Sequence, residues 1–148
     1  MDRKGFLKTC GFACLGASSI GLLLQSCVGS KMVTAQISGE NIIVPLSVFE
    51  IIKNNEKTYR KYVVVQNTQL QYPISVYRFS DQEFTAIYMR CTHQGAELTV
   101  NGDKMVCSAH GSEFDNKGNV QSSPADKPLS TFPVTIDKQN LKISLKAS

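Results

Sequence analysis

The sequence lacks several features that point to common functions. Its 148 residues include no tryptophan and only two histidines. Neither a G-x-G-x-x-G pattern nor a phosphate-binding loop motif occurs, so no segment is typical of nucleotide binding. Lysine and arginine leave a net charge of +4 but form no basic cluster, which argues against a nucleic-acid partner. No apolar pattern of about twelve residues or more has helical spacing, so a helical bundle is not expected.

The sequence does contain a succession of short β-forming runs. Hydrophobic residues make up 42% of the chain, which is enough for one globular core. The β-forming runs cover residues 33–37, 42–49, 59–65, 73–79 and 84–89. Asn101-Gly102 predicts a hairpin within 98–106, and a second hairpin has its turn at 137–140. We therefore expect an all-β fold, an antiparallel sandwich or barrel.

The first residues are typical of an export signal. A basic start at residues 2–8 precedes an uncharged, largely apolar stretch from 9 to 26. The segment ends in Leu24-Gln25-Ser26-Cys27, which resembles the lipobox of bacterial lipoproteins and implies cleavage before Cys27 and acylation of that residue. The predicted organisation is a signal peptide over 1–26, a lipidated Cys27 with a tether over 27–32, and a folded domain over 33–148.

An uncleaved transmembrane anchor is the alternative, since about 18 apolar residues are near the minimum that spans a bilayer. In either case we expect the domain to lie in the cell envelope, attached to a membrane and facing the periplasm or the exterior. Residues 3–8 also resemble a twin-arginine export signal, with Lys4 in the second arginine position. The sequence leaves open the export route, the choice of inner or outer membrane, and the oligomeric state.

Cysteine usage leaves two thiols for the folded domain. Cys10 and Cys14 belong to the predicted signal and Cys27 to the lipid anchor, so Cys91 and Cys107 remain. A disulfide between these two is one explanation in an exported protein. It does not explain why a histidine follows each cysteine at short spacing.

The two histidines complete a four-ligand set. Cys91-x-His93 and Cys107-x-x-His110 each offer one thiolate and one imidazole, which suit iron or zinc. Because the hairpin predicted at Asn101-Gly102 returns the chain to the place it left, the two segments are expected side by side. Structural zinc sites usually draw two cysteines from one segment and two histidines from another, so iron is favoured and zinc is the second hypothesis.

Cys-x-His, followed by Cys-x-x-His-Gly-Ser and a Pro-bearing loop at residues 122–129, resembles the Rieske [2Fe–2S] proteins. The similarity spans roughly residues 59–145. It implies a Rieske-like β fold with a cluster-binding subdomain of two loops. It further implies that Cys91 and Cys107 bind the inner iron, while His93 and His110 bind the outer iron near solvent.

The same resemblance assigns roles to neighbouring residues. Gly95 and Gly111 stand where the backbone approaches the cluster. Ser112 matches the serine whose hydroxyl donates to a bridging sulfide. Pro124 belongs to the loop that covers the cluster from a third side.

Three further positions indicate which kind of Rieske site this is. Phe114 stands where high-potential members carry tyrosine, so a hydrogen bond toward a cysteine sulfur is expected to be missing and the potential to be lower. Ala96 and Ala109 stand where quinol-oxidising subunits carry a disulfide that joins the two loops.

The predicted function is an exported, membrane-tethered protein that carries one electron on a Rieske [2Fe–2S] cluster for a redox partner protein. With both histidines used as ligands, no base remains for nucleophilic catalysis, and no catalytic residue is expected. One alternative is the Rieske subunit of a quinol-oxidising complex of the cytochrome bc type. Another is a structural zinc-binding lipoprotein.

Overall fold

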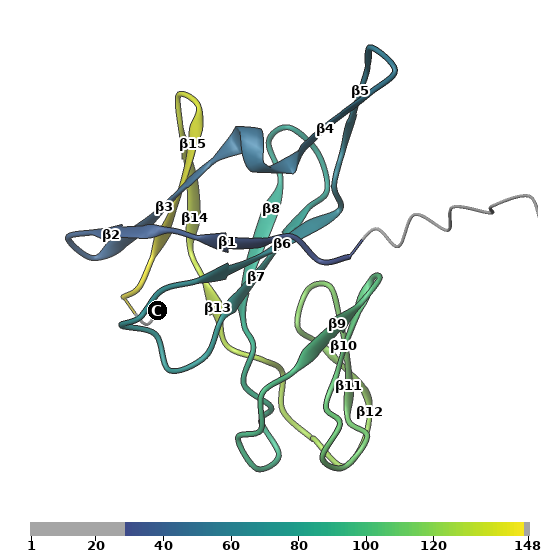
Figure 1. Cartoon of the computed structure of the whole chain (residues 1–148). Helices are drawn as coiled ribbons and strands as arrows, with labels where there is room; N and C mark the ends of the chain where they lie inside the picture. The colour runs from purple at the N-terminus through teal and green to yellow at the C-terminus, as the bar shows by residue number, and fades with distance from the viewer. Residues whose placement is uncertain (1–28, 147–148) are drawn as a thin grey trace, which may run out of the picture.

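The computed structural model describes residues 29–146 (Figure 1). The predicted signal peptide and the lipidation site Cys27 therefore lie outside the described residues. The described chain forms fifteen short strands and one 3₁₀ helix: β1 (Met32–Thr34), β2 (Gln36–Ser38), β3 (Asn41–Pro45), η1 (Leu46–Phe49), β4 (Glu50–Lys53), β5 (Glu56–Tyr59), β6 (Tyr62–Gln66), β7 (Ile74–Arg78), β8 (Phe84–Tyr88), β9 (Thr99–Asn101), β10 (Lys104–Val106), β11 (Glu113–Asp115), β12 (Val120–Ser122), β13 (Thr131–Phe132), β14 (Val134–Asp137) and β15 (Asn140–Ser144). Among residues 29–146, no helix combines the length and the apolar character needed to cross a membrane.

A central sheet carries the rest of the domain. Its five strands run in the order β1-β6-β7-β8-β13, and a sheet of order β14-β15-β3-β2 packs on one side of it. The small sheet β12-β11-β10-β9 lies on the other side, whereas β4 and β5 form a separate hairpin that projects from the body (Figure 1). Strand pairs are antiparallel apart from β1 beside β6, so the expected all-β, largely antiparallel architecture is confirmed.

Alternation along the central strands divides the interior into two cores. In β6, Val63 and Val65 enter the core shared with β3 and β15, and Val64 enters the core shared with the small sheet. In β8, Ala86 and Ile87 divide in the same way. Burying an aliphatic side chain contributes roughly 1.5–3 kcal/mol, so a one-residue slip of register would expose or mismatch both cores.

Four predicted elements differ in detail from the structure. The run predicted over 33–37 is divided at Ala35 into β1 and β2, and the run over 59–65 is divided between β5 and β6; each pair of strands belongs to two different sheets. The run predicted over 42–49 ends as a strand at Pro45 and continues as the 3₁₀ helix, because proline has no N–H to donate to a sheet ladder. The hairpin predicted at Asn101-Gly102 exists, but Asn101 pairs with Lys104, so its loop is Gly102-Asp103. Of the two loop residues, only Gly102 has a positive φ, +61°.

The C-terminal hairpin follows its prediction. Ile136 pairs with Leu141 and Val134 with Ile143, and Leu141 and Ile143 are fully buried. The two hairpin-forming regions thus have different tasks. The β14–β15 hairpin closes the core that contains Val63 and Val65. The β9–β10 hairpin, which follows β8, positions the two Cys-His segments.

Candidate metal centre

The first Cys-His segment is a tight loop between β8 and β9. Its Cys91 N–H donates to the Ala96 carbonyl over 2.8 Å, and the Gly95 N–H donates back to the Cys91 carbonyl over 2.9 Å. These two bonds close the loop on its own backbone. The cysteine is held at the base, and His93, two residues further on, lies exposed.

The second segment, between β10 and β11, repeats this backbone pattern. The Cys107 N–H donates to the Ser112 carbonyl over 2.9 Å, and the Gly111 N–H donates to the Cys107 carbonyl over 2.9 Å. Its histidine follows the cysteine at the third position, not the second, and is also exposed. Two loops with the same hydrogen bonds therefore present their histidines from different points of the turn.

Backbone conformation explains the glycine in each loop. Gly95 and Gly111 have φ of +76° and +82°, a region that other residues adopt at a cost. A Cβ on Gly95 would also lie 3.2 Å from an Arg90 guanidinium nitrogen, whereas a Cβ on Gly111 would meet nothing within 4 Å. Their expected approach to a cluster stays a prediction.

The two thiols lie under the loops in an apolar setting. Cys91 and Cys107 are each 1% exposed and both are free, so the alternative of a disulfide between them is wrong. They pack in the same core as Met105 and Phe114. A thiolate in such a place is unfavourable without a compensating cation, and a metal supplies one.

The two imidazoles lie against each other at the surface. The ring centroids of His93 and His110 are 5.0 Å apart, with the rings edge to face at 89°. The structure thus brings the four predicted ligands into two loops that touch, with sulfur inside and imidazole outside. A donor set of two thiols and two imidazoles in this arrangement fits a binuclear iron–sulfur cluster.

The same side chains do not form a site for a single metal ion. Among residues 29–146, no three side chains of His, Cys, Asp or Glu converge as one metal ion requires. A binuclear cluster spreads its four protein ligands over two irons, two on each, and needs no convergence of three protein ligands on one ion.

A third segment, the loop at residues 122–129, ties to both ligand loops. The buried Ser112 Oγ accepts the Ala125 N–H over 3.0 Å, and Thr92 Oγ1 donates to the Lys127 carbonyl over 2.7 Å. Pro124 is exposed in the same loop. These contacts hold the Pro-bearing loop against the loops that carry the thiols and imidazoles.

Tyr72 is a contributor that sequence reasoning missed. Its hydroxyl donates to the Gly95 carbonyl over 2.7 Å, and its ring packs edge to face on Tyr88 at 5.6 Å. Ala96 is partly buried and Ala109 is exposed, and neither can form a disulfide between the loops. The hydrogen bonds of Tyr72 and Thr92 hold the first loop in place instead. Nothing in the sequence near Tyr72 signals this contact, which spans 23 residues.

Asp115, at the end of β11, organises the turn below the second loop. Its Oδ1 accepts the N–H groups of Lys117 and Asn119 over 2.9 and 2.8 Å, and the Asn119 side-chain amide also donates to it. Burial alone would raise the pKa of Asp115, but these hydrogen bonds from Asn119 and Lys117 together hold it below its usual value.

The chain is similar to proteins of one known family. The model of a family described as "Rieske [2Fe-2S] domain" matches residues 47–133. The "Cytochrome b6-f complex iron-sulfur subunit" of Prochlorococcus marinus is 36% identical over 56 residues, covering 36% of this chain and 32% of that protein. A second such subunit, from Nostoc sp., is 33% identical over 60 residues, covering 39% of this chain and 34% of the relative. This chain thus spans about a third of the length of the curated relatives it matches.

A solved structure shares the fold. The cyanobacterial plasma membrane Rieske protein PetC3 from Synechocystis PCC 6803 superposes with a TM-score of 0.50 at 26% sequence identity. The superposition covers 57% of this chain and 86% of that one. The Rieske-like architecture expected from the sequence is therefore confirmed.

Replacing Ser112 by alanine should destabilise the domain. Ser112 is 0% exposed, and loss of its Oγ leaves the buried Ala125 N–H without a partner, which costs about 1–3 kcal/mol. The exposed Ser108→Ala is the matched control and should stay within about 0.5 kcal/mol of the parent. Urea unfolding measures both, and equal midpoints for the two variants would contradict the assignment.

Asp115→Asn should lower stability in a pH-dependent way. Because the pKa of the folded carboxyl is depressed, its stabilising effect is full above the unfolded pKa of about 3.9 and is lost as pH falls through the lower folded value. The variant should be less stable than the parent at neutral pH, by an amount that solvent screening keeps small, and the difference should shrink below about pH 4. Urea titrations across this range test it, with the exposed Asp126→Asn as control; a pH-independent difference speaks against the mechanism.

Proposed function

Because the chain belongs to the Rieske [2Fe-2S] domain family, we propose that it is an exported, membrane-tethered protein that carries one electron on a [2Fe-2S] cluster. The observation that carries the proposal is the pair of matching loops, which have buried free thiols and exposed imidazoles whose ring centroids are 5.0 Å apart. When bound, such a cluster supplies one-electron oxidation and reduction. The chain's own residues bind it, shield it and present it.

We assign the ligands as the sequence predicted them. Cys91 and Cys107 would hold the inner iron, because their thiols lie in the apolar core. His93 and His110 would hold the outer iron, because their rings lie at the surface. An exposed imidazole edge gives a partner protein a short route to the site.

The surrounding residues tune and shield the site. Ser112 Oγ already accepts the Ala125 N–H, so its own hydrogen is free to donate to a bridging sulfide, as the family resemblance implies. Phe114 is completely buried in the same core as both cysteines and brings no hydroxyl. Fewer donors to the sulfurs stabilise the reduced state less, so we infer a lower potential than in relatives with tyrosine there.

The membrane tether is proposed from the lipobox-like residues 24–27. Strand β1 starts at Met32, five residues after Cys27. Five extended residues reach at most about 18 Å, so a lipid on Cys27 would hold the domain close to the membrane surface. We therefore propose that the domain lies in the cell envelope, facing the periplasm or the exterior.

A second candidate is the Rieske subunit of a quinol-oxidising complex. It is supported by the curated relatives, which are cytochrome b6-f iron–sulfur subunits. Ala96 and Ala109 count against it, because they leave no loop-joining disulfide where the resemblance expects one in such subunits. Deleting the gene separates the two: loss of quinol-dependent cytochrome reduction in membranes indicates the subunit, and unchanged activity indicates the separate carrier.

Metal and spectroscopic analysis tests the proposed cluster. The purified full chain should be reddish brown, contain two irons per chain and give a Rieske-type EPR signal on reduction. Cys107→Ser should abolish iron binding, whereas Ser108→Ala, at the exposed next position of the same loop, should not. A colourless protein with one zinc per chain would establish the structural zinc alternative instead.

Phe114→Tyr should raise the midpoint potential. An added hydrogen bond toward a cysteine sulfur favours the reduced state, and about 1 kcal/mol corresponds to a shift of about 40 mV for one electron. Protein-film voltammetry measures the potential. Phe79→Tyr, a partly buried phenylalanine that packs against the same core, is the control and should leave it unchanged. An unchanged or lower potential for Phe114→Tyr refutes the hydrogen-bond explanation.

A further inference from the structure

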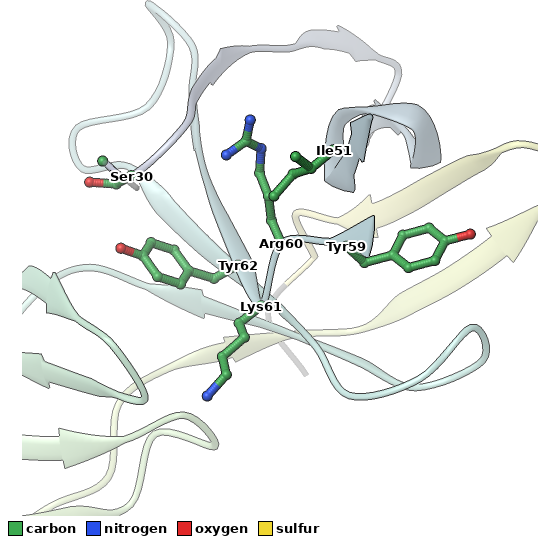
Figure 2. A pocket seen from close by; sticks show the side chains of 7 residues that line it. Ser30, Ile51, Tyr59, Arg60, Lys61 and Tyr62 are labelled. Carbon is green, nitrogen blue, oxygen red and sulfur yellow. The ribbon is translucent and has the colours of Figure 1, made fainter. Parts of the chain in front are cut away.

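A pocket of about 210 Å³ opens between the start of the described chain and the base of the β4–β5 hairpin (Figure 2). Its walls are formed by Gly29, Ser30, Ile51, Tyr59, Arg60, Lys61 and Tyr62. None of these residues belongs to the ligand loops or to the Pro-bearing loop. The pocket is therefore separate from the proposed metal centre.

Arg60 is the charged group that faces this pocket. Figure 2 shows its guanidinium between Ile51 and Ser30, while the neighbouring Tyr59 and Lys61 side chains point away. Its Nε is buried and has no hydrogen-bond partner among residues 29–146. A buried donor without a partner is unfavourable, and a guanidinium pairs best with an oxyanion such as a phosphate.

The other charged groups nearby are mostly paired. Lys57 lies 2.6 Å from Glu50, and Lys61 lies 3.0 Å from Asp103. Within the described part of the chain, none of the ion pairs includes Arg60. The pocket thus holds a cation without a counter-ion.

The hairpin beside the pocket exposes apolar side chains. Ile52 is 74% exposed and Tyr59 43%, two of the three large hydrophobic residues most exposed in the described chain. A two-stranded hairpin that pairs with no other strand cannot bury such groups by itself. At a lipid interface, apolar side chains enter the acyl boundary and basic residues are attracted to anionic headgroups. Ile52 and Arg60 supply one group of each kind on this surface, whereas the Tyr59 ring is contacted by Arg78 and Lys57.

The chain's own path places this surface next to the proposed anchor. Gly29 and Ser30 line the pocket, and Cys27 precedes Gly29 by two residues, at most about 7 Å of extended chain. Figure 1 shows the β4–β5 hairpin and the ligand loops after β8 and β10 at opposite ends of the domain. A membrane at the hairpin end would leave the histidines facing the aqueous phase.

We propose that the Arg60 pocket binds the phosphate of an anionic phospholipid headgroup, with Ile52 entering the lipid interface beside it. This inference rests on the proposed lipid anchor at Cys27, which supplies a high effective concentration of lipid for an otherwise weak contact. The contact fixes the orientation of the tethered domain. Electron exchange then takes place with a partner in the aqueous phase.

The absence of tryptophan makes the contact directly measurable. The full chain carrying Ile52→Trp is reconstituted in vesicles of phosphatidylcholine, alone or mixed with phosphatidylglycerol. Trp emission should shift to the blue, and brominated acyl chains should quench it, in the mixed vesicles. The control Gln36→Trp, on the exposed edge strand β2, should show neither change.

Arg60→Gln in the Ile52→Trp background should weaken docking on the mixed vesicles about fivefold, the effect of one basic residue near an anionic surface. Lys117→Gln removes the same charge elsewhere and should have little effect. Hydrogen exchange of residues 50–61 in the unsubstituted chain gives a second readout. Those amides should be more protected on mixed than on phosphatidylcholine vesicles.

The proposal is overturned if Ile52→Trp has the same emission in both vesicle types. It is also overturned if the Ile52→Trp and Gln36→Trp proteins are quenched equally, or if Arg60→Gln and Lys117→Gln have equal effects. Protection of residues 50–61 that appears only with a protein partner would assign the surface to that partner instead. The EPR signal and the mass of the Cys27 peptide, recorded on the same samples, report separately on the cluster and the anchor. Failure of headgroup binding is thereby distinguished from failure of the proposed function.

Discussion

The site depends on one constraint: two thiols must lie in an apolar core while two imidazoles, two or three residues away, stay in water. The chain meets it with the same turn used twice. In each loop the cysteine N–H and carbonyl are both satisfied inside the turn, by residues five and four positions later. The cysteine side chains pack in the core with Met105 and Phe114. The rings of His93 and His110 contact each other at the surface.

The central sheet makes this arrangement stable. Its strands bury one set of side chains against β3 and β15 and the alternate set against the small sheet that carries the second ligand loop. The core beneath the cysteines is therefore continuous with the sheet. The Pro-bearing loop and Tyr72 complete the support from outside, through Ser112, Thr92 and the Gly95 carbonyl.

Local sequence was sufficient for the elements whose signal is local. The Cys-His spacing, the alternation in β14 and β15, and the positive φ of Gly102 could all be read from neighbouring residues. The register of the β9–β10 hairpin was one residue off, because Asn101 and Gly102 both suit a turn and only cross-strand pairing chooses between them. Tyr72 and Arg60 could not be predicted, since their roles come from contacts with distant parts of the chain.

In the proposed site, His93 and His110 bind the same cluster as the two buried cysteines. Because the chain contains only these two histidines, protein grown with ¹⁵N-histidine carries the label at no other ligand. Pulsed EPR of the reduced, untagged protein should show two nitrogens coordinated directly to iron, both replaced by ¹⁵N. One coordinated histidine nitrogen, or none, would contradict the proposed ligand set.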